Sequence, residues 1–178
     1  MRSDTIQIDN RGNGFTEVLE EIQKVVEYKK IGYKQSLQLQ LIGEEMLSLA
    51  RSVTGEMQAS FWLESDNNKF VMHLSTKTIM DKEKRYLLLS SSTSRKNEAA
   101  KGFLGRLRDS FEKAMASTID HEYQELPADI QSDLTSGPIY DPEWDGYERS
   151  VLRTIADDIK ISIKGGLVEM TVTKDFAA

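Results

Sequence analysis

The sequence predicts an α+β fold, a two-layer sandwich in which one mixed, mostly antiparallel sheet carries helices on one face. Two observations lead to this prediction. Two stretches alternate apolar and polar residues around a tight turn, which is the pattern of a β-hairpin. Other stretches repeat apolar residues at spacings of three and four, which is the pattern of an amphipathic helix. Since hairpins and helices occupy separate parts of the chain, the elements are segregated as in α+β folds.

The composition fits one domain spanning residues 1–178, with 39% hydrophobic and 29% charged residues. A net charge of −6 argues against a nucleic-acid binder, which would carry a basic surface. No apolar run reaches the roughly 18 to 20 residues of a membrane span, and no apolar segment near the start resembles a secretory signal. We therefore expect a cytoplasmic protein. With no cysteine and only His73 and His121, no metal site is predicted.

The first half of the chain predicts a short strand at 4–9 and two helices. The first helix starts near Phe15 and ends near Gly32, and the second covers about 34–54. On the second helix, one apolar stripe is formed by Leu39, Ile42, Met46, Leu49, Ala50 and Val53. Glu44 falls on the opposite face, whereas Glu45 falls at the border of the stripe. We therefore expect Glu45, and not Glu44, to be partly buried.

Each hairpin is predicted with its register. Asn67-Asn68 suits a two-residue turn because Asn tolerates positive φ. Gly165-Gly166 suits such a turn because Gly tolerates positive φ as well. The pairs expected on one face are Phe61 with Leu74, Leu63 with Met72, Ile159 with Val172, Ile161 with Met170, and Ile163 with Val168. On the other face of the first hairpin, Trp62 is expected opposite His73.

Between the hairpins, the sequence favours a helix over a strand at about 81–92. It also predicts a helix over 97–115 with Asn97 as its cap. The buried stripe expected on that helix is Ala100, Leu104, Leu107, Phe111 and Met115. All three prolines fall in 127–146, which predicts a loop or lid, and a last helix is predicted over about 147–159. Residues 81–145 therefore read as a helical and acidic, lid-like insertion.

The charge of this insertion is uneven. Residues 81–113 contain nine Lys or Arg against five Asp or Glu, whereas residues 114–148 contain nine Asp or Glu and no Lys or Arg. Opposite charges attract each other, so the acidic run can contact the basic stretch. We expect the acidic run to be a cover segment held partly by the basic stretch, and deletion of 120–143 would test this.

Two stretches carry a resemblance to a known family. "LIGEEMLSLARSV" (41–53) looks like an N-box helix, and "RTIADDIKISIKGGLVEMTVTKDF" (153–176) looks like the closing helix and last two strands of the same family. Together with the element order, they resemble the histidine-kinase-like ATPase superfamily (GHKL or Bergerat fold), and within it the anti-sigma-factor serine kinases. The resemblance spans most of the chain except about 81–145. It implies the histidine-kinase-like ATPase fold.

The resemblance also implies roles for residues of the second helix. The family's N-box is Glu-x-x-x-Asn, in which Glu acts as the base and Asn holds Mg²⁺ against the nucleotide. Glu45 stands at the Glu position, but Leu49 stands at the Asn position. Leucine cannot ligate Mg²⁺, which prefers oxygen. The alternative register sets Glu44 against Ser48, which retains an oxygen but turns the pair away from the apolar stripe.

The family's other nucleotide motifs are also altered. Ser75 or Thr76 stands where an Asp should read adenine, and the two glycines that follow in the family are missing. The nearest match to the glycine-rich lid is "SSTSRKNEAAKGFLG" (91–105). Its candidate phosphate contacts, at a helix N-terminus, are Ser92, Ser94, Arg95, Lys96 and Lys101.

These departures favour a regulatory domain over an active enzyme, because phosphoryl transfer needs the metal and the positioned base together. We expect weak or absent binding of ATP and Mg²⁺, and action through a regulatory protein partner. The alternative is a divergent ATP-dependent serine kinase that uses Glu45 as its base. A third alternative is another small ligand in the remnant pocket. The resemblance makes a homodimer or a complex with a partner plausible, and the sequence identifies no surface for either.

Overall fold

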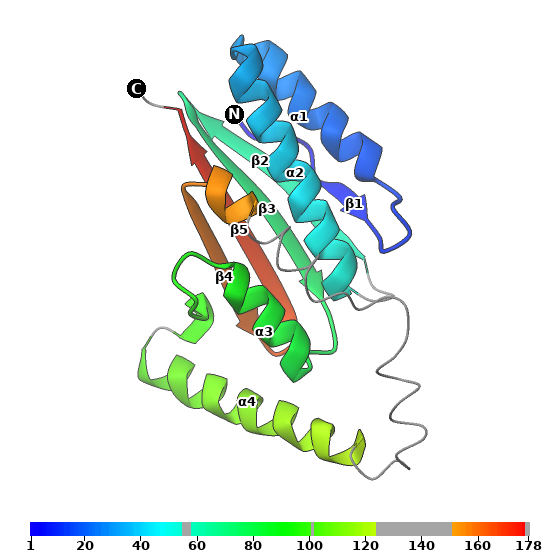
Figure 1. Ribbon diagram of the computed structural model, residues 1–178, viewed down its shortest axis with the longest axis vertical. Helices are drawn as coiled ribbons and strands as arrows, with labels where there is room; N and C mark the ends of the chain where they lie inside the picture. Colours follow the sequence, from blue (N-terminus) through cyan, green and yellow to red (C-terminus); the bar gives the residue numbers. More distant parts are fainter. Residues whose placement is uncertain (55–57, 101, 124–150, 177–178) are drawn as a thin grey trace.

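A computed structural model of the chain describes residues 1–54, 58–100, 102–123 and 151–176. Figure 1 shows the arrangement of its elements. In chain order they are β1 (Ile6–Ile8), α1 (Phe15–Lys29), α2 (Tyr33–Thr54), β2 (Ala59–Asp66), β3 (Lys69–Lys77), α3 (Lys82–Ser91), the 3₁₀ helix η1 (Glu98–Ala100), α4 (Phe103–Tyr123), β4 (Asp158–Lys164) and β5 (Leu167–Asp175). A further helical turn covers 151–155.

The strands form one five-stranded sheet in the order β1-β2-β3-β5-β4. Every pairing between these strands is antiparallel. The α+β class and the antiparallel sheet are therefore confirmed, but the expectation of a mixed sheet is wrong for the described strands. Parallel pairing occurs there only as an isolated bridge between Asn97 and Ile161.

Both hairpins have the register that the sequence predicts. Trp62 lies opposite His73, and the other pairs of the first hairpin follow with Asn67 at a φ of 49° in the turn. In the second hairpin Ile161 lies opposite Met170, and both turn glycines have positive φ. Alternate residues of each strand are consequently buried on one face of the sheet.

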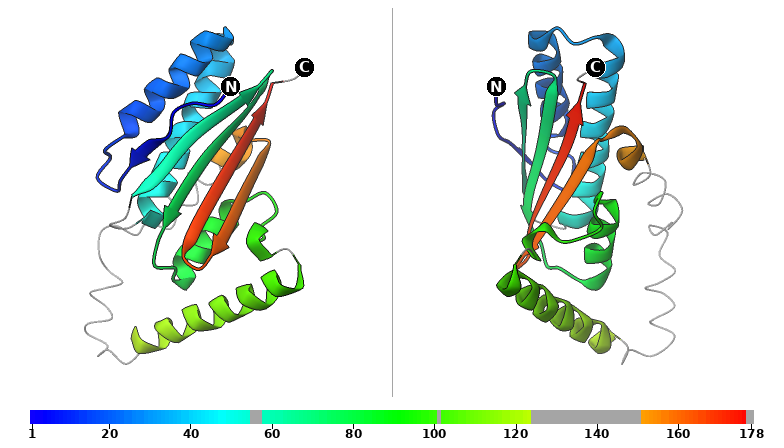
Figure 2. Two further views of the ribbon diagram at one scale, coloured as in Figure 1. Left: turned by 180° about the vertical axis from the view of Figure 1, so that it is seen from behind. Right: turned by 90° about the vertical axis from the view of Figure 1, so that its left-hand side faces the viewer.

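The helices cover one face of this sheet, and α4 crosses its end (Figure 2). The stripe that the sequence predicts on α2 is buried in full, and it packs with α1 against inward-facing strand residues such as Phe61 and Leu74. Close packing of α1 on α2 depends on Gly43, since a Cβ there would lie 2.4 Å from Cδ1 of Ile22. The core thus lies between the α1–α2 pair and the sheet.

The segment after the first hairpin is helical, as predicted, because α3 is capped by Asp81, whose carboxylate accepts a hydrogen bond from the Lys84 amide at 2.7 Å. The helix expected over 97–115 is interrupted. Residues Glu98–Ala100 form a 3₁₀ turn, and α4 begins only at Phe103. Asn97 therefore does not cap α4. Its side-chain oxygen accepts a hydrogen bond from the Ala99 amide of η1 at 3.1 Å, and the side chain is also bonded to β4, as described below.

Two further expectations fall mainly beyond the described residues. The loop at 127–146 lies outside them, as does the acidic cover segment after Tyr123. Of the last predicted helix, 151–155 is helical, but β4 begins at Asp158 because the hairpin pattern takes over there.

Within the described residues, no helix is both long enough and apolar enough to cross a lipid bilayer.

Candidate functional site

The α2 helix carries the residues that the resemblance assigns to catalysis. Glu44 is exposed and Glu45 is half-buried, as the helical pattern predicts. One turn beyond Glu45, the Leu49 side chain is 9% exposed and belongs to the hydrophobic core. Ser48 is half-buried beside it. The position at which the family places its Mg²⁺ ligand is thus occupied by an apolar side chain that helps to hold α2 on the sheet.

The side chain at this position cannot be a ligand of a nucleotide-bound Mg²⁺. Mg²⁺ requires oxygen ligands in near-octahedral geometry, and Leu49 offers none. Among the residues that the structure describes, no three His, Asp or Glu side chains are grouped so that they could hold a metal ion.

Ser75 and Thr76, the candidates for reading adenine, point to opposite faces of the sheet. Thr76 is buried on the helix-covered face, whereas Ser75 is half-buried on the other face. The Thr76 hydroxyl donates to the carbonyl oxygens of Gln58 at 3.1 Å and Lys77 at 3.3 Å. Nearby, the Thr78 hydroxyl donates to the Val53 carbonyl at 2.7 Å, which joins the end of α2 to the end of β3. These threonines therefore have structural bonds at the junction of helix and sheet.

The candidate phosphate contacts lie elsewhere. Arg95 and Lys96 are exposed in the loop between α3 and η1, and Lys101 is outside the described residues. Arg95 has a φ of 54°, and its amide donates to the Ser92 carbonyl in a tight turn. This loop is fixed beside β4, because the Ile159 amide donates to the Thr93 hydroxyl at 2.8 Å. The expected helix N-terminus is absent at Arg95 and Lys96, since η1 has only three residues.

A buried polar cluster, not predicted from the sequence, joins α3, α4 and β4. The Arg85 guanidinium donates to the Asp109 carboxylate, and both side chains are almost fully buried. The Asn97 amide donates to Asp109 at 2.6 Å and to the Ile163 carbonyl at 2.9 Å, and its oxygen accepts from the Ile163 amide at 2.8 Å. Asn97 therefore forms hydrogen bonds with both backbone groups of Ile163 on the edge strand β4, and its bond to Asp109 anchors α4.

The charge of Asp109 is stabilised in this cluster. Burial by itself raises the pKa of Asp109, but hydrogen bonds from Asn97 and Arg85 outweigh it and hold the pKa below its ordinary value. Lys113 adds an ion pair at 3.3 Å. Near Asp109 on the same helix, Glu112 accepts a hydrogen bond from the Gly165 amide at 3.1 Å. The contacts of α4 with the rest of the domain are thus largely polar.

The apolar stripe predicted to be buried on α4 is instead exposed. Leu104, Leu107 and Phe111 have exposed fractions of 77%, 60% and 66%, and Ala100 is half-buried. The side chain of Met115 lies outside the described part. The expectation was wrong because it assumed that an apolar face must turn inward, whereas Asp109 and Glu112 bind the inward face of this helix to the domain.

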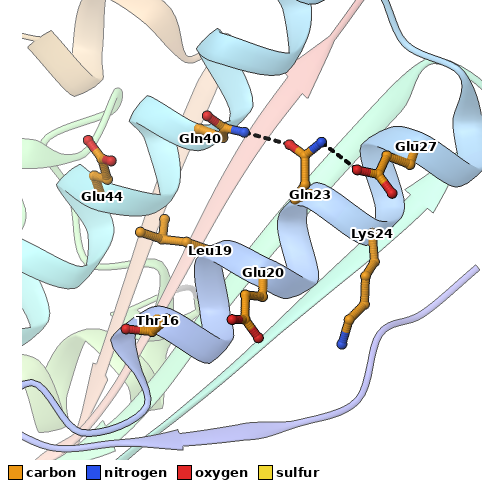
Figure 3. Close-up of a pocket in the computed structure, with 8 residues that line it drawn as sticks. All are labelled: Thr16, Leu19, Glu20, Gln23, Lys24, Glu27, Gln40 and Glu44. Carbon is orange, nitrogen blue, oxygen red and sulfur yellow. Dashed lines mark hydrogen bonds between the residues drawn. The ribbon is translucent and has the colours of Figure 1, made fainter.

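A shallow groove of about 430 Å³ runs along the outer side of α1 and α2 (Figure 3). Its lining residues are Thr16, Leu19, Glu20, Gln23, Lys24, Glu27, Gln40 and Glu44. Gln40 donates to Gln23 at 2.6 Å, and Gln23 donates to Glu27 at 2.8 Å. Glu44 therefore faces this acidic groove, so the alternative register of Glu44 with Ser48 points away from the sheet.

The open face of the sheet carries a second polar cluster. The Trp62 and His73 rings stack with centroids 4.8 Å apart, and the Arg2 guanidinium lies 5.2 Å from the Trp62 ring. Glu64 lies 3.8 Å from Nε2 of His73. Burial, the largest effect, lowers the pKa of His73, and Arg2 lowers it further against the opposing effect of Glu64. The arrangement ties the N-terminal residues to β2.

Taken together, the site residues that the resemblance suggests are distributed over α2, the end of β3 and the loop after α3. No protein-family model matches this chain, and no curated protein matches it either.

Proposed function

We propose that this protein is a cytoplasmic regulatory domain of the histidine-kinase-like ATPase type. It resembles the anti-sigma-factor serine kinases, acts through contacts with a protein partner, and has weak or lost ATP binding. The observation that supports the proposal best is the burial of Leu49 in the core. An apolar, buried residue at the position of the family's metal ligand cannot bridge Mg²⁺ to a nucleotide.

A second observation supports the same proposal. The Thr76 hydroxyl, at a position where the family reads adenine, is already bonded to the carbonyl oxygens of Gln58 and Lys77. The two basic residues Arg95 and Lys96 lie in a loop that is bonded to β4 through Thr93. These contacts support the proposal of weak or lost ATP binding.

The alternative function is a divergent ATP-dependent serine kinase with Glu45 as its base. The position of Glu45 favours it, because Glu45 is half-buried at the border of the apolar stripe of α2, where the resemblance places the base. This alternative would need an oxygen ligand other than Leu49 for the metal.

Calorimetric titration with ATP and ADP, with and without Mg²⁺, separates the two functions. The proposal expects no heat, or weak binding that does not depend on Mg²⁺. Micromolar binding that requires Mg²⁺ would contradict it and favour the kinase. Turnover assays of Glu45→Gln beside the exposed neighbour Glu44→Gln provide a matched control, since only the kinase alternative predicts that the first change alone abolishes activity.

A further inference from the structure

Residues 93–97 occupy the free side of β4, the strand at one edge of the sheet. They belong to the loop between α3 and η1, which lies beside β4 in Figure 1. At one end, the Ile159 amide donates to the Thr93 hydroxyl at 2.8 Å, and the Thr93 amide donates to the Ile159 carbonyl at 2.9 Å. At the other end, the Asn97 side chain bonds to the amide and the carbonyl of Ile163 at 2.8 Å and 2.9 Å. We call residues 93–97 the edge segment.

The Asn97 side chain takes the place of a peptide group in a neighbouring strand. Like a peptide group, it offers a donor and an acceptor, and both are bonded to one residue of β4, Ile163. An isolated bridge also joins Asn97 to Ile161. Asn97 is only 8% exposed, and its bond to Asp109 at 2.6 Å fixes the side chain in the buried cluster. Along β4, the edge segment therefore engages the backbone groups that another strand would need.

The sequence of β4, DIKISIK, is suited to pairing with a second copy of itself. An edge strand with free backbone groups readily pairs with another chain. Antiparallel pairing about a twofold axis at Ile161 places Ile159 opposite Ile163, so that the residues whose backbone groups face outward are bonded to each other. The same register places Asp158 opposite Lys164, and the axis repeats this pair. Opposite charges at facing positions stabilise paired strands.

We propose that the edge segment blocks β4 against pairing with the β4 strand of a second copy of this chain. The amide and carbonyl groups that would join the two copies are bonded to Thr93 and Asn97 instead. Removing these bonds opens the edge of β4 to the second copy. This inference goes beyond the proposed function and does not rest on it, because it involves neither nucleotide nor the regulatory partner.

The double variant Thr93→Val/Asn97→Ala removes the side-chain bonds between the edge segment and β4. In hydrogen exchange of dilute protein, followed by NMR, the amides of Ile159 and Ile163 should exchange at least about tenfold faster than in the wild type, because each loses its acceptor. In sedimentation equilibrium over about 1 μM to 1 mM protein, the double variant should associate at least about tenfold more tightly than the wild type. Lys96→Ala is the matched control, since Lys96 is exposed within the edge segment, and it should change neither result.

Charge changes at the two ends of β4 test the register. In the double variant, Lys164→Glu sets a like charge opposite Asp158 in both symmetric pairs and should raise the dissociation constant about tenfold. Adding Asp158→Lys restores opposite charges, so the dissociation constant should return to within about threefold of that of the double variant.

Three outcomes would overturn the proposal. One is a folded double variant in which Ile159 and Ile163 exchange faster but association is the same as in the wild type. Another is unchanged exchange of both amides, since the edge segment would then not protect β4. The third is association that Lys164→Glu does not weaken, which would show that the copies meet elsewhere.

A single variant decides the question if the double variant does not fold. Thr93→Pro removes both groups that are bonded to Ile159 and leaves Asn97 in the buried cluster. Ser92 can precede a proline because its backbone is extended, with φ −73° and ψ 151°. Thr93→Pro should also associate more tightly than the wild type, and unchanged association would overturn the proposal.

Discussion

Arg85 on α3 and Asp109 on α4 form an ion pair in which the two side chains are only 7% and 10% exposed. The pair is supported by Asn97, which also bonds to both backbone groups of Ile163 on the edge strand. Two helices and a strand are thereby joined by polar contacts at the end of the sheet. Because buried charges depend on their partners, this cluster provides the sharpest tests of the structure.

Removing one partner of this ion pair should destabilise the fold strongly. Asp109→Ala leaves the Arg85 guanidinium buried without its counter-charge, and we expect the free energy of unfolding to fall by about 3 to 5 kcal/mol in urea denaturation. The control is Asp158→Ala, which breaks the exposed pair with Lys160 and should cost less than about 1 kcal/mol. Arg85→Met combined with Asp109→Leu should restore most of the loss. Equal losses in Asp109→Ala and Asp158→Ala would contradict the burial of the cluster.

Acid should weaken the fold partly through Asp109. Because the pKa of Asp109 is lowered in the folded state, the unfolded chain takes up the proton first as pH falls. The stability contributed by Asp109 is therefore complete above its unfolded pKa near 3.8 and is lost as pH falls through the folded pKa. Asp157 acts in the same direction. Urea denaturation from pH 6 to pH 2 should show a shallower loss for Asp109→Asn than for the wild type, and parallel curves would disprove the assignment.

His73 should titrate below its ordinary pKa of 6.5 in the folded protein. Burial against Trp62 disfavours the charged ring, so the unfolded chain binds the proton first and stability falls as pH drops below about 6.5. NMR titration of the imidazole signals measures this pKa, with His73→Gln separating the signal from that of His121. Arg2→Gln should raise the pKa and Glu64→Gln should lower it, because Arg2 opposes and Glu64 favours the charged ring. Shifts in the same direction would exclude this electrostatic account.

Gly43→Ala tests the close contact of α1 and α2. Alanine improves helix propensity by about 1 kcal/mol, but its Cβ would meet Cδ1 of the fully buried Ile22. Overpacking should prevail, with a net loss of about 1 kcal/mol in thermal or urea unfolding. Ile22→Val removes the clashing methyl group. The double variant should therefore be more stable than the sum of the two single changes predicts, and strict additivity would show that the helices can separate without cost.

Leu49→Asn tests whether the family's metal ligand can be restored. The buried amide has no designed partner, and we expect a loss of about 3 kcal/mol or more in the free energy of unfolding. The proposed function expects no Mg²⁺-dependent ATP binding in calorimetry of this variant at a temperature where it remains folded. Leu37→Asn, at a more exposed position of the same helix, should cost little. Appearance of Mg²⁺-dependent binding in Leu49→Asn would mean that the pocket is retained and only its ligand is missing.

The sequence by itself determined the local parts of this fold. Each hairpin register followed from period-two alternation around Asn67-Asn68 and Gly165-Gly166, because a two-residue turn leaves only one pairing that keeps the apolar residues on one face. The buried stripe of α2 and the unequal exposure of Glu44 and Glu45 followed from the helical period in the same way. In these elements, the residues that the pattern predicts to be buried are the ones that lie in the core.

Tertiary structure alone decided how α4 is placed. Its pattern predicted that Leu104, Leu107 and Phe111 would be buried, but the sequence does not reveal that Arg85, Asn97 and the Gly165 amide meet at the end of the sheet. Once those groups are brought together, the ionic and hydrogen-bonding requirements of Asp109 and Glu112 hold the polar face inward. An apolar stripe predicts only that one face of a helix packs against another surface. Which face of α4 turns toward its own domain is decided by the positions of groups that are distant in the sequence.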